Sequence, residues 1–299
     1  MAGKLQVKQV FGLVNHSENS LAWSADHMLA YNSGAHVVVL NTETKEQGLI
    51  PTFGTHVSNN QSLGATAITT SHPKKFIAVA ERGENVGLVV FYDSHSLRKK
   101  RVLHYPELGS KEYKCVAFSD DGRQCLTQGA GPDWNLVLWS VEKTVKMVCS
   151  TKIALSDDNA VNQVSFCPWD STLCVVVGKG YARLYRIIEG AFKQLAMSVR
   201  RDDRTNFLSH CWLPDEILIL GTSAGEILLI ENNEYRGVIY PSSAPGGPSS
   251  AGGGYDASAS GIVGGAPEEL TPVFCFCPTS RGFVAGTVDG EIRMFERST

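Results

Sequence analysis

A short turn recurs along the chain at nearly constant spacing, and this repeat constrains the fold more than any other feature of the sequence. Each copy follows one apolar segment and precedes another, and an aromatic residue stands before most of the turns. The six copies lie at residues 23–27, 70–74, 118–122, 166–170, 212–216 and 276–280. Their second residues are separated by 47, 48, 48, 46 and 64 positions. Such a period indicates one supersecondary unit repeated in series.

Each unit contains the pattern of four short strands. In the third unit the strand-like segments are 113–118, 123–128, 134–141 and 144–153. In the fifth unit they are 207–212, 217–222, 226–231 and 234–240. Polar or glycine turns join these segments, and no helical periodicity lies between them. Because the period is close to the roughly 40–45 residues of a WD blade and the ~50 of a kelch blade, the sequence predicts an all-β propeller over residues 1–299, a single domain with six recognisable blades. Another repetitive β architecture is the alternative.

The WD signature is present in some units and degraded in others. The third strand of several units ends in an aromatic residue, and Trp139 occupies the place where WD blades carry tryptophan. Asp289 lies in a turn that resembles the WD turn with a buried structural aspartate. No Gly-His pair opens a unit, so we expect packing, rather than the Asp-His-Ser-Trp hydrogen-bond network, to stabilise most blades.

Two segments fall outside the repeat. Residues 241–268 consist mostly of Gly, Ser, Ala and Pro, which predicts a flexible surface insertion, with a docking loop that orders on binding as the alternative. The last unit has three strands, while residues 1–19 contain an additional apolar segment at 5–13. We expect this segment to be a closing strand, because propellers pair their ends and so leave no open sheet edge. It would join the sixth unit, giving six blades, or a seventh that this chain does not contain.

Residue spacing argues against catalysis and against metal binding. The eight histidines share no repeated spacing with Cys or Asp, and Cys275 and Cys277 have no second pair at the spacing of a zinc site. We therefore expect no enzymatic activity, no cofactor and no metal. A formal charge of -3 gives no general attraction for nucleic acid, and no apolar stretch reaches the ~20 residues of a membrane helix. We therefore expect neither nucleic acid nor a membrane as a partner.

The densest basic run is the candidate protein-binding patch. It consists of Arg98, Lys99, Lys100 and Arg101, which we expect on the exposed fourth strand of the second unit. Most runs of this kind are solvated faces. The functional alternative is a surface that binds an acidic protein, such as tubulin.

Several segments resemble one axonemal WD-repeat family, cilia- and flagella-associated protein fifty-seven, in its N-terminal propeller. The resemblance rests on residues 10–13, 32–36, 48–51, 98–103, 135–139, 162–166 and 281–283. It implies a longer protein with tandem propellers and a coiled coil, cytoplasmic before assembly and then located on the axoneme of motile cilia. It also implies a first propeller that continues past this chain, which favours seven blades and a truncated chain.

The resemblance and the repeat together predict a non-enzymatic scaffold module of the axonemal cytoskeleton. The expected partners are axonemal proteins, above all inner dynein arm components and their regulatory assemblies, with tubulin as a further candidate. Blades that display many loops at fixed positions suit multivalent docking. The alternative is a general peptide-recognition propeller that acts as an adaptor in a degradation or transport complex.

Overall fold

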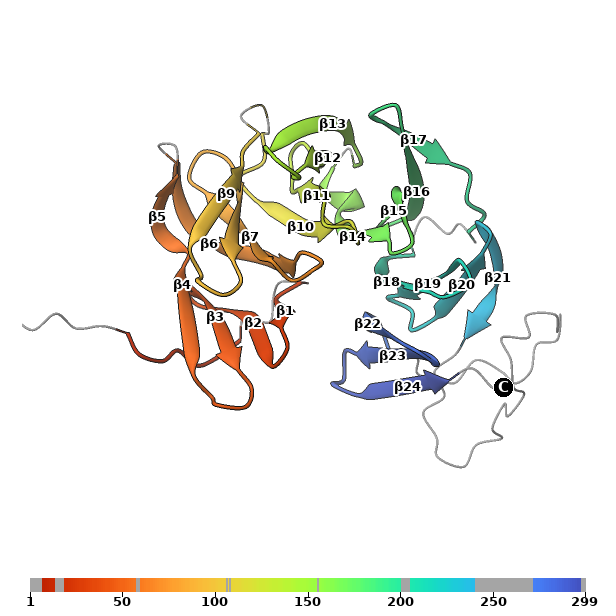
Figure 1. The fold of residues 1–299 in the computed structure, drawn as a ribbon. Coiled ribbons are helices and arrows are strands. Elements are labelled where there is room, and N and C mark those ends of the chain that lie inside the picture. Colours follow the sequence, from red (N-terminus) through yellow and green to blue (C-terminus); the bar gives the residue numbers. More distant parts are fainter. Residues whose placement is uncertain are drawn as a thin grey trace, which may run out of the picture. The chain divides into compact units, whose positions relative to one another are not determined.

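The structure is a computed structural model that describes residues 7–13, 19–57, 60–105, 107, 109–154, 156–199, 205–239 and 271–296. Within these ranges nearly all regular structure is β-strand, and the helical element is the short 3-10 helix η1 (Asp157–Asn159). The strands form six sheets, in which consecutive strands are hydrogen-bonded neighbours (Figure 1). No helix in the described ranges has the length and apolar character needed to cross a membrane.

The chain divides into two compact units, residues 1–175 with 185–193 and residues 176–184 with 194–299. The first sheet of the first unit contains β1 (Leu21–Ala25), β2 (Met28–Ser33), β3 (His36–Asn41) and β4 (Gln47–Pro51). The second sheet contains β5 (Phe53–Val57), β6 (Asn60–Thr70), β7 (Phe76–Gly83), β8 (Leu88–Asp93) and β9 (Lys99–Leu103). The third contains β10 (Tyr113–Phe118), β11 (Gln124–Gly129), β12 (Asn135–Ser140) and β13 (Lys146–Lys152).

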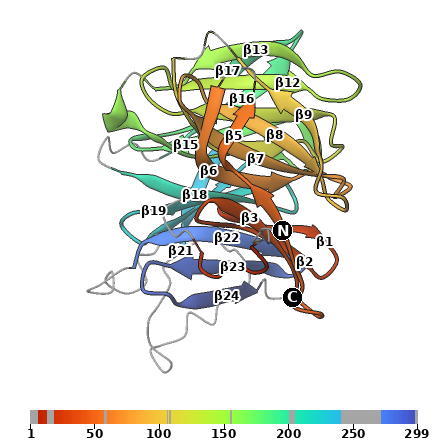
Figure 2. The ribbon, with the colours of Figure 1, turned by 90° about the vertical axis from the view of Figure 1, so that its left-hand side faces the viewer.

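The fourth sheet has residues in both units and contains β14 (Val161–Cys167), β15 (Asp170–Gly178), β16 (Tyr181–Ile188) and β17 (Ala191–Leu195). The fifth sheet, in the second unit, contains β18 (Phe207–Leu213), β19 (Ile217–Thr222), β20 (Ile227–Glu231) and β21 (Glu234–Ile239). The sixth contains β22 (Val273–Thr279), β23 (Gly282–Thr287) and β24 (Ile292–Glu296), side by side in Figure 2. These sheets are the blades of a six-bladed β-propeller, and the predicted fold class is confirmed.

The repeated turn owes its position to a buried residue that bridges the first and second strands. Ser71 Oγ accepts a hydrogen bond from the Phe76 backbone N–H at 3.0 Å, and Ser119 Oγ accepts one from Gln124 N–H at 3.0 Å. Ser24, at the same place in the first sheet, donates to the Met28 carbonyl at 3.2 Å. A hydroxyl buried at this point needs a local partner, and the backbone across the turn supplies it.

Alternating side chains of one strand build two separate cores in the first unit. On β7, Ile77 and Val79 pack with residues of the first sheet such as Val39, while Ala78 and Ala80 pack with residues of the third. Successive side chains of a strand point to opposite faces, so a sheet covered on both sides reads as a continuous apolar run. This explains the continuous apolar run of β7 from Phe76 to Ala80.

Two parts of the architecture differ from expectation. The second sheet has five strands, because the 11-residue β6 continues beyond its pairing with β7 and offers an edge to β5. Residues 7–13 form no strand, and they contact the first sheet through side chains: Gln47 Oε1 accepts from Val10 N–H at 2.9 Å, and Ser33 Oγ donates to the Phe11 carbonyl at 3.3 Å. Closure by residues 5–13 stays a prediction, since residues 1–6 lie outside the described residues, as do residues 241–268.

Candidate protein-binding surface

Lys99, Lys100 and Arg101 of the basic run begin β9, an edge strand of the second sheet, and Arg98 directly precedes it. Lys99 pairs with Tyr92 and Arg101 with Phe91, so Lys100 is the additional residue of a β-bulge. Arg98, Lys99 and Lys100 are all exposed. A bulge and a row of cations at a sheet edge both oppose pairing with a foreign strand, so this edge presents its side chains and not its backbone.

Arg101 has a different environment from the rest of the run. Its guanidinium donates through Nη1 to the Val141 carbonyl and through Nη2 to the Glu142 carbonyl at 3.2 Å. The same group lies over the Phe76 ring, 5.4 Å from the centroid. Arg101 therefore links β9 to the third sheet, and the run divides into three exposed cations and one that fastens two sheets together.

The three exposed cations have no carboxylate within 4.0 Å among the described residues, whereas many other cations of the chain are ion-paired. The lysines and arginines with an ion pair are Lys74 with Asp26, Arg82 and Lys114 with Glu112, Arg123 with Glu142, Arg186 with Asp170, Arg236 with Glu231, and Arg293 with Glu291. Unpaired positive charge concentrated at one site is available to an external anion.

Two carboxylates lie close enough to the run to be influenced by its charge. Burial raises the pKa of Glu81 to about 7, and hydrogen bonds from Ser62 and Tyr92 and the charge of Lys99 offset only part of that rise. Hydrogen bonds from the Ser96 backbone and hydroxyl lower the pKa of Asp93, with a small contribution from Lys100. Glu81 is buried and Asp93 is partly exposed, so of these two carboxylates only Asp93 can reduce the positive charge that a partner would meet.

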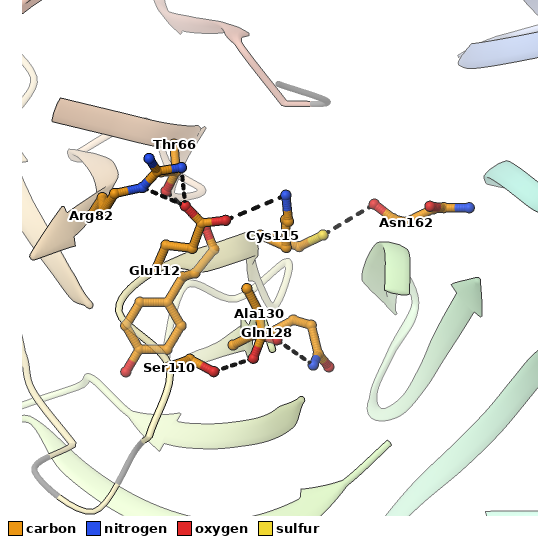
Figure 3. A network of polar contacts seen from close by, with 11 residues as sticks. Thr66, Arg82, Ser110, Glu112, Cys115, Gln128, Ala130 and Asn162 are labelled. Atoms are coloured by element: carbon orange, nitrogen blue, oxygen red, sulfur yellow. Dashed lines mark hydrogen bonds and ion pairs between the residues drawn. The ribbon is translucent and has the colours of Figure 1, made fainter. Parts of the chain in front are cut away.

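A second polar network connects β6 and β7 of the second sheet with the start of β10, and β10 with β14 (Figure 3). Glu112 accepts from Arg82 Nε at 2.6 Å, and Lys114 Nζ lies 3.4 Å from the other carboxylate oxygen. Thr66 Oγ1 donates to the Tyr113 carbonyl at 2.7 Å, and the Cys115 thiol lies 3.2 Å from the Asn162 carbonyl. Charged groups that are paired within such a network orient the strands and have few free hydrogen-bonding positions for a ligand. The role of this network is therefore structural.

The structure places the two residues expected to carry the WD signature in unlike surroundings. Trp139 is buried, and its Nε1–H donates to Thr127 Oγ1 at 2.9 Å, which joins β12 to β11. Asp289 is exposed and accepts from Thr271 Oγ1 at 2.9 Å, so the expectation of a buried aspartate is wrong for this chain. The physical reason is that, among the described residues of the second unit, only the fifth sheet packs on the sixth, and it leaves this turn uncovered.

Titratable groups elsewhere give no sign of a reaction centre. In the described part of the chain, no three or more His, Cys, Asp or Glu side chains gather as metal ligands would. Cys275 and Cys277 are exposed on β22, and burial lowers the pKa of His210 on β18 to about 3. A histidine with so low a pKa stays neutral at physiological pH and cannot exchange protons there.

No family model matches the chain. It is 31% identical to cilia- and flagella-associated protein 57 of Mus musculus over 233 residues, which cover 77% of this chain and 18% of that protein. It is 24% identical to human cilia- and flagella-associated protein 52, covering 75% of this chain and 35% of the relative. The chain is a relative of cilia- and flagella-associated protein 57.

The solved structures agree with the fold. The β-propeller domain of Myceliophteria thermophila Cps50 (Swd1) superposes with a TM-score of 0.58 at 16% identity, covering 81% of this chain and 69% of that one. The chain spans about a fifth of the length of the mouse cilia- and flagella-associated protein 57. The properties of that whole protein therefore extend to this chain only as proposals.

Proposed function

We propose that the chain is a non-enzymatic scaffold module of the motile-cilium axoneme, which docks neighbouring proteins and helps to position inner dynein arms. The observation that carries the proposal is the 31% identity to a cilia- and flagella-associated protein over 77% of the chain. The six sheets support it, because they hold their connecting turns at fixed positions and suit many weak contacts better than one deep site.

The unpaired cations of β9 supply a surface for such contacts. Because the backbone of a sheet is already ordered, a partner that binds there has to order side chains only. The described residues contain no cluster of metal ligands, and the buried titratable groups Glu81 and His210 lie within sheets, away from solvent. These features favour a binding protein over an enzyme.

The test is the location of the tagged chain in multiciliated cells, followed by its removal. We expect the chain to remain with axonemes after a moderate salt wash and expect its loss to reduce inner dynein arm components in purified axonemes. A uniformly cytosolic chain that salt-washed axonemes lack would overturn the axonemal proposal, and unchanged dynein arms would overturn the positioning role. Recovery with ubiquitin-ligase or transport subunits instead would favour the adaptor alternative.

A further inference from the structure

Three segments of the first unit meet at the Phe76 ring, and each brings cations. Lys75 Nζ and the Arg101 guanidinium both lie 5.4 Å from the ring centroid. Arg101 also donates to the carbonyls of Val141 and Glu142, at the turn between β12 and β13. The start of β7, the start of β9 and this turn are therefore fastened to one point.

This arrangement extends the basic run into a larger surface. Lys143 lies in the turn that Arg101 contacts, directly after Glu142, and Lys146 begins β13. The resulting set, called here the Phe76 basic surface, consists of Lys75, Arg98, Lys99, Lys100, Lys143 and Lys146, all of them exposed. None has a carboxylate within 4.0 Å among the residues that the structure describes.

The carboxylates beside this surface are already engaged. Glu142 lies 3.7 Å from Arg123, and Asp93 accepts hydrogen bonds of 2.8 Å from both the backbone N–H and the hydroxyl of Ser96. Asp121 and Asp26 are also ion-paired, with Arg123 and Lys74, so these four acids all have local partners, whereas the six cations have no carboxylate within 4.0 Å. The whole chain has a formal charge of -3, so this positive region is a local feature.

We propose that the Phe76 basic surface binds an extended, acidic, unstructured segment of a partner protein. This inference rests on the docking function proposed above and specifies the chemistry of one partner. The lysine ammonium groups are point charges that accept carboxylates in many orientations, which suits a flexible acidic peptide. Five of the six cations are lysines, and the Arg101 fork is already directed at two backbone carbonyls, which leaves Arg98 as the one guanidinium of the surface. The bulge at Lys100 opposes strand addition, so recognition occurs through side chains.

The experiment measures binding of a fluorescent polyglutamate peptide to the purified chain by fluorescence anisotropy. We expect saturable binding that weakens steeply with added salt, because the interacting charges are exposed. The double variant K99E/K100E should weaken binding about tenfold or more, since each reversal replaces attraction by repulsion. Thermal melting of each variant establishes that the fold is retained.

The matched control is the double variant K111E/K152E, which changes the net charge equally at exposed positions away from Phe76. The Lys111 carbonyl accepts a hydrogen bond from the Gly83 N–H, at the opposite end of β7 from Phe76, and Lys152 is at the opposite end of β13 from Lys146. We expect its affinity to stay within about twofold of the unaltered chain. Equal weakening of peptide binding by both variants would show that binding follows net charge, and would overturn the assignment of the Phe76 basic surface as the binding site.

Two further results would overturn the proposal in different ways. Tighter binding to duplex DNA or to phosphatidylserine vesicles than to polyglutamate would reject an acidic peptide as the partner. Absence of polyglutamate binding at low salt would reject the surface itself. If the unaltered chain nevertheless stays on salt-washed axonemes, the proposed function survives and only this docking mode fails.

Discussion

The second and sixth sheets come from the same repeat but differ in how much of each is covered. Both faces of the second sheet are buried: Ile77 and Val79 on one side of β7, Ala78 and Ala80 on the other, are fully inaccessible. The sixth sheet buries one face, where Phe283 packs with residues of the fifth sheet. Its other face is apolar and exposed in the described part of the chain.

The exposed face of the sixth sheet follows the strand register closely. Cys275 pairs with Gly286, which pairs with Ile292, and in the next row Cys277, Val284 and Met294 are paired in the same way. Ile292 is 80% exposed and Met294 is 67% exposed. The second and sixth sheets therefore both have two apolar faces, and a neighbouring sheet determines whether such a face contributes to stability.

The largest expected effect is at the centre of the covered region. Phe91 is fully buried, with its ring centroid 5.1 Å from that of Phe118 and 6.0 Å from that of Phe76. Phe91→Ala should lower the free energy of unfolding by roughly 3–5 kcal/mol, because the cavity cannot collapse between two sheets. Urea denaturation followed by tryptophan fluorescence measures it.

Phe274→Ala is the matched control on the sixth sheet, where the ring is 45% exposed. We expect it to cost about 1 kcal/mol or less, because most of the side chain already contacts solvent. Similar losses for the two variants would contradict the contrast between the covered and open sheets.

The next effect concerns a charge inside the covered region and depends on pH. Burial raises the pKa of Glu81 to about 7 from an ordinary value of 4.5, so the folded state holds the proton more tightly than the unfolded state. Its contribution to stability is complete below pH 4.5 and is lost as pH rises through about 7. Glu81→Gln should therefore gain stability relative to the unaltered chain across this range, by up to about 3 kcal/mol.

Melting temperatures of both proteins from pH 4.5 to pH 8 measure this difference, with Glu84→Gln as the control at an exposed position of the following turn. A stability difference between the Glu81→Gln protein and the unaltered chain that does not change with pH would show that Glu81 is solvated or fully paired in the folded chain. The burial of the Glu81 carboxylate on β7 would then need revision.

The strands were predictable where local chemistry decides them. The predicted strands of the third and fifth units agree with β10–β13 and β18–β21 within about two residues, because glycine, asparagine and serine turns set their ends independently of the neighbours. β5 was missed, since it lies outside the repeat and forms only because β6 extends beyond β7.

The candidate site was predictable in part. A run of four adjacent basic residues is visible in the sequence, but the separate role of Arg101 depends on carbonyls of Val141 and Glu142, 40 residues away. Lys75, Lys143 and Lys146 carry no local signal that joins them to the run. Asp289 shows the opposite case, in which a local motif was recognised but its burial depended on a covering sheet.

The smallest expected effect is on the open face of the sixth sheet. Ile292→Ser and Met294→Ser remove apolar side chains that are mostly in solvent, so each should change the free energy of unfolding by less than about 0.5 kcal/mol. The pair should also lower the fluorescence of bound anilinonaphthalene sulfonate, because the dye binds exposed apolar patches. A loss of about 2 kcal/mol or more, measured by urea denaturation, would mean that this face packs against other residues in solution. In that case the sixth sheet would have both faces buried, as the second sheet does, and the two sheets would be stabilised in the same way.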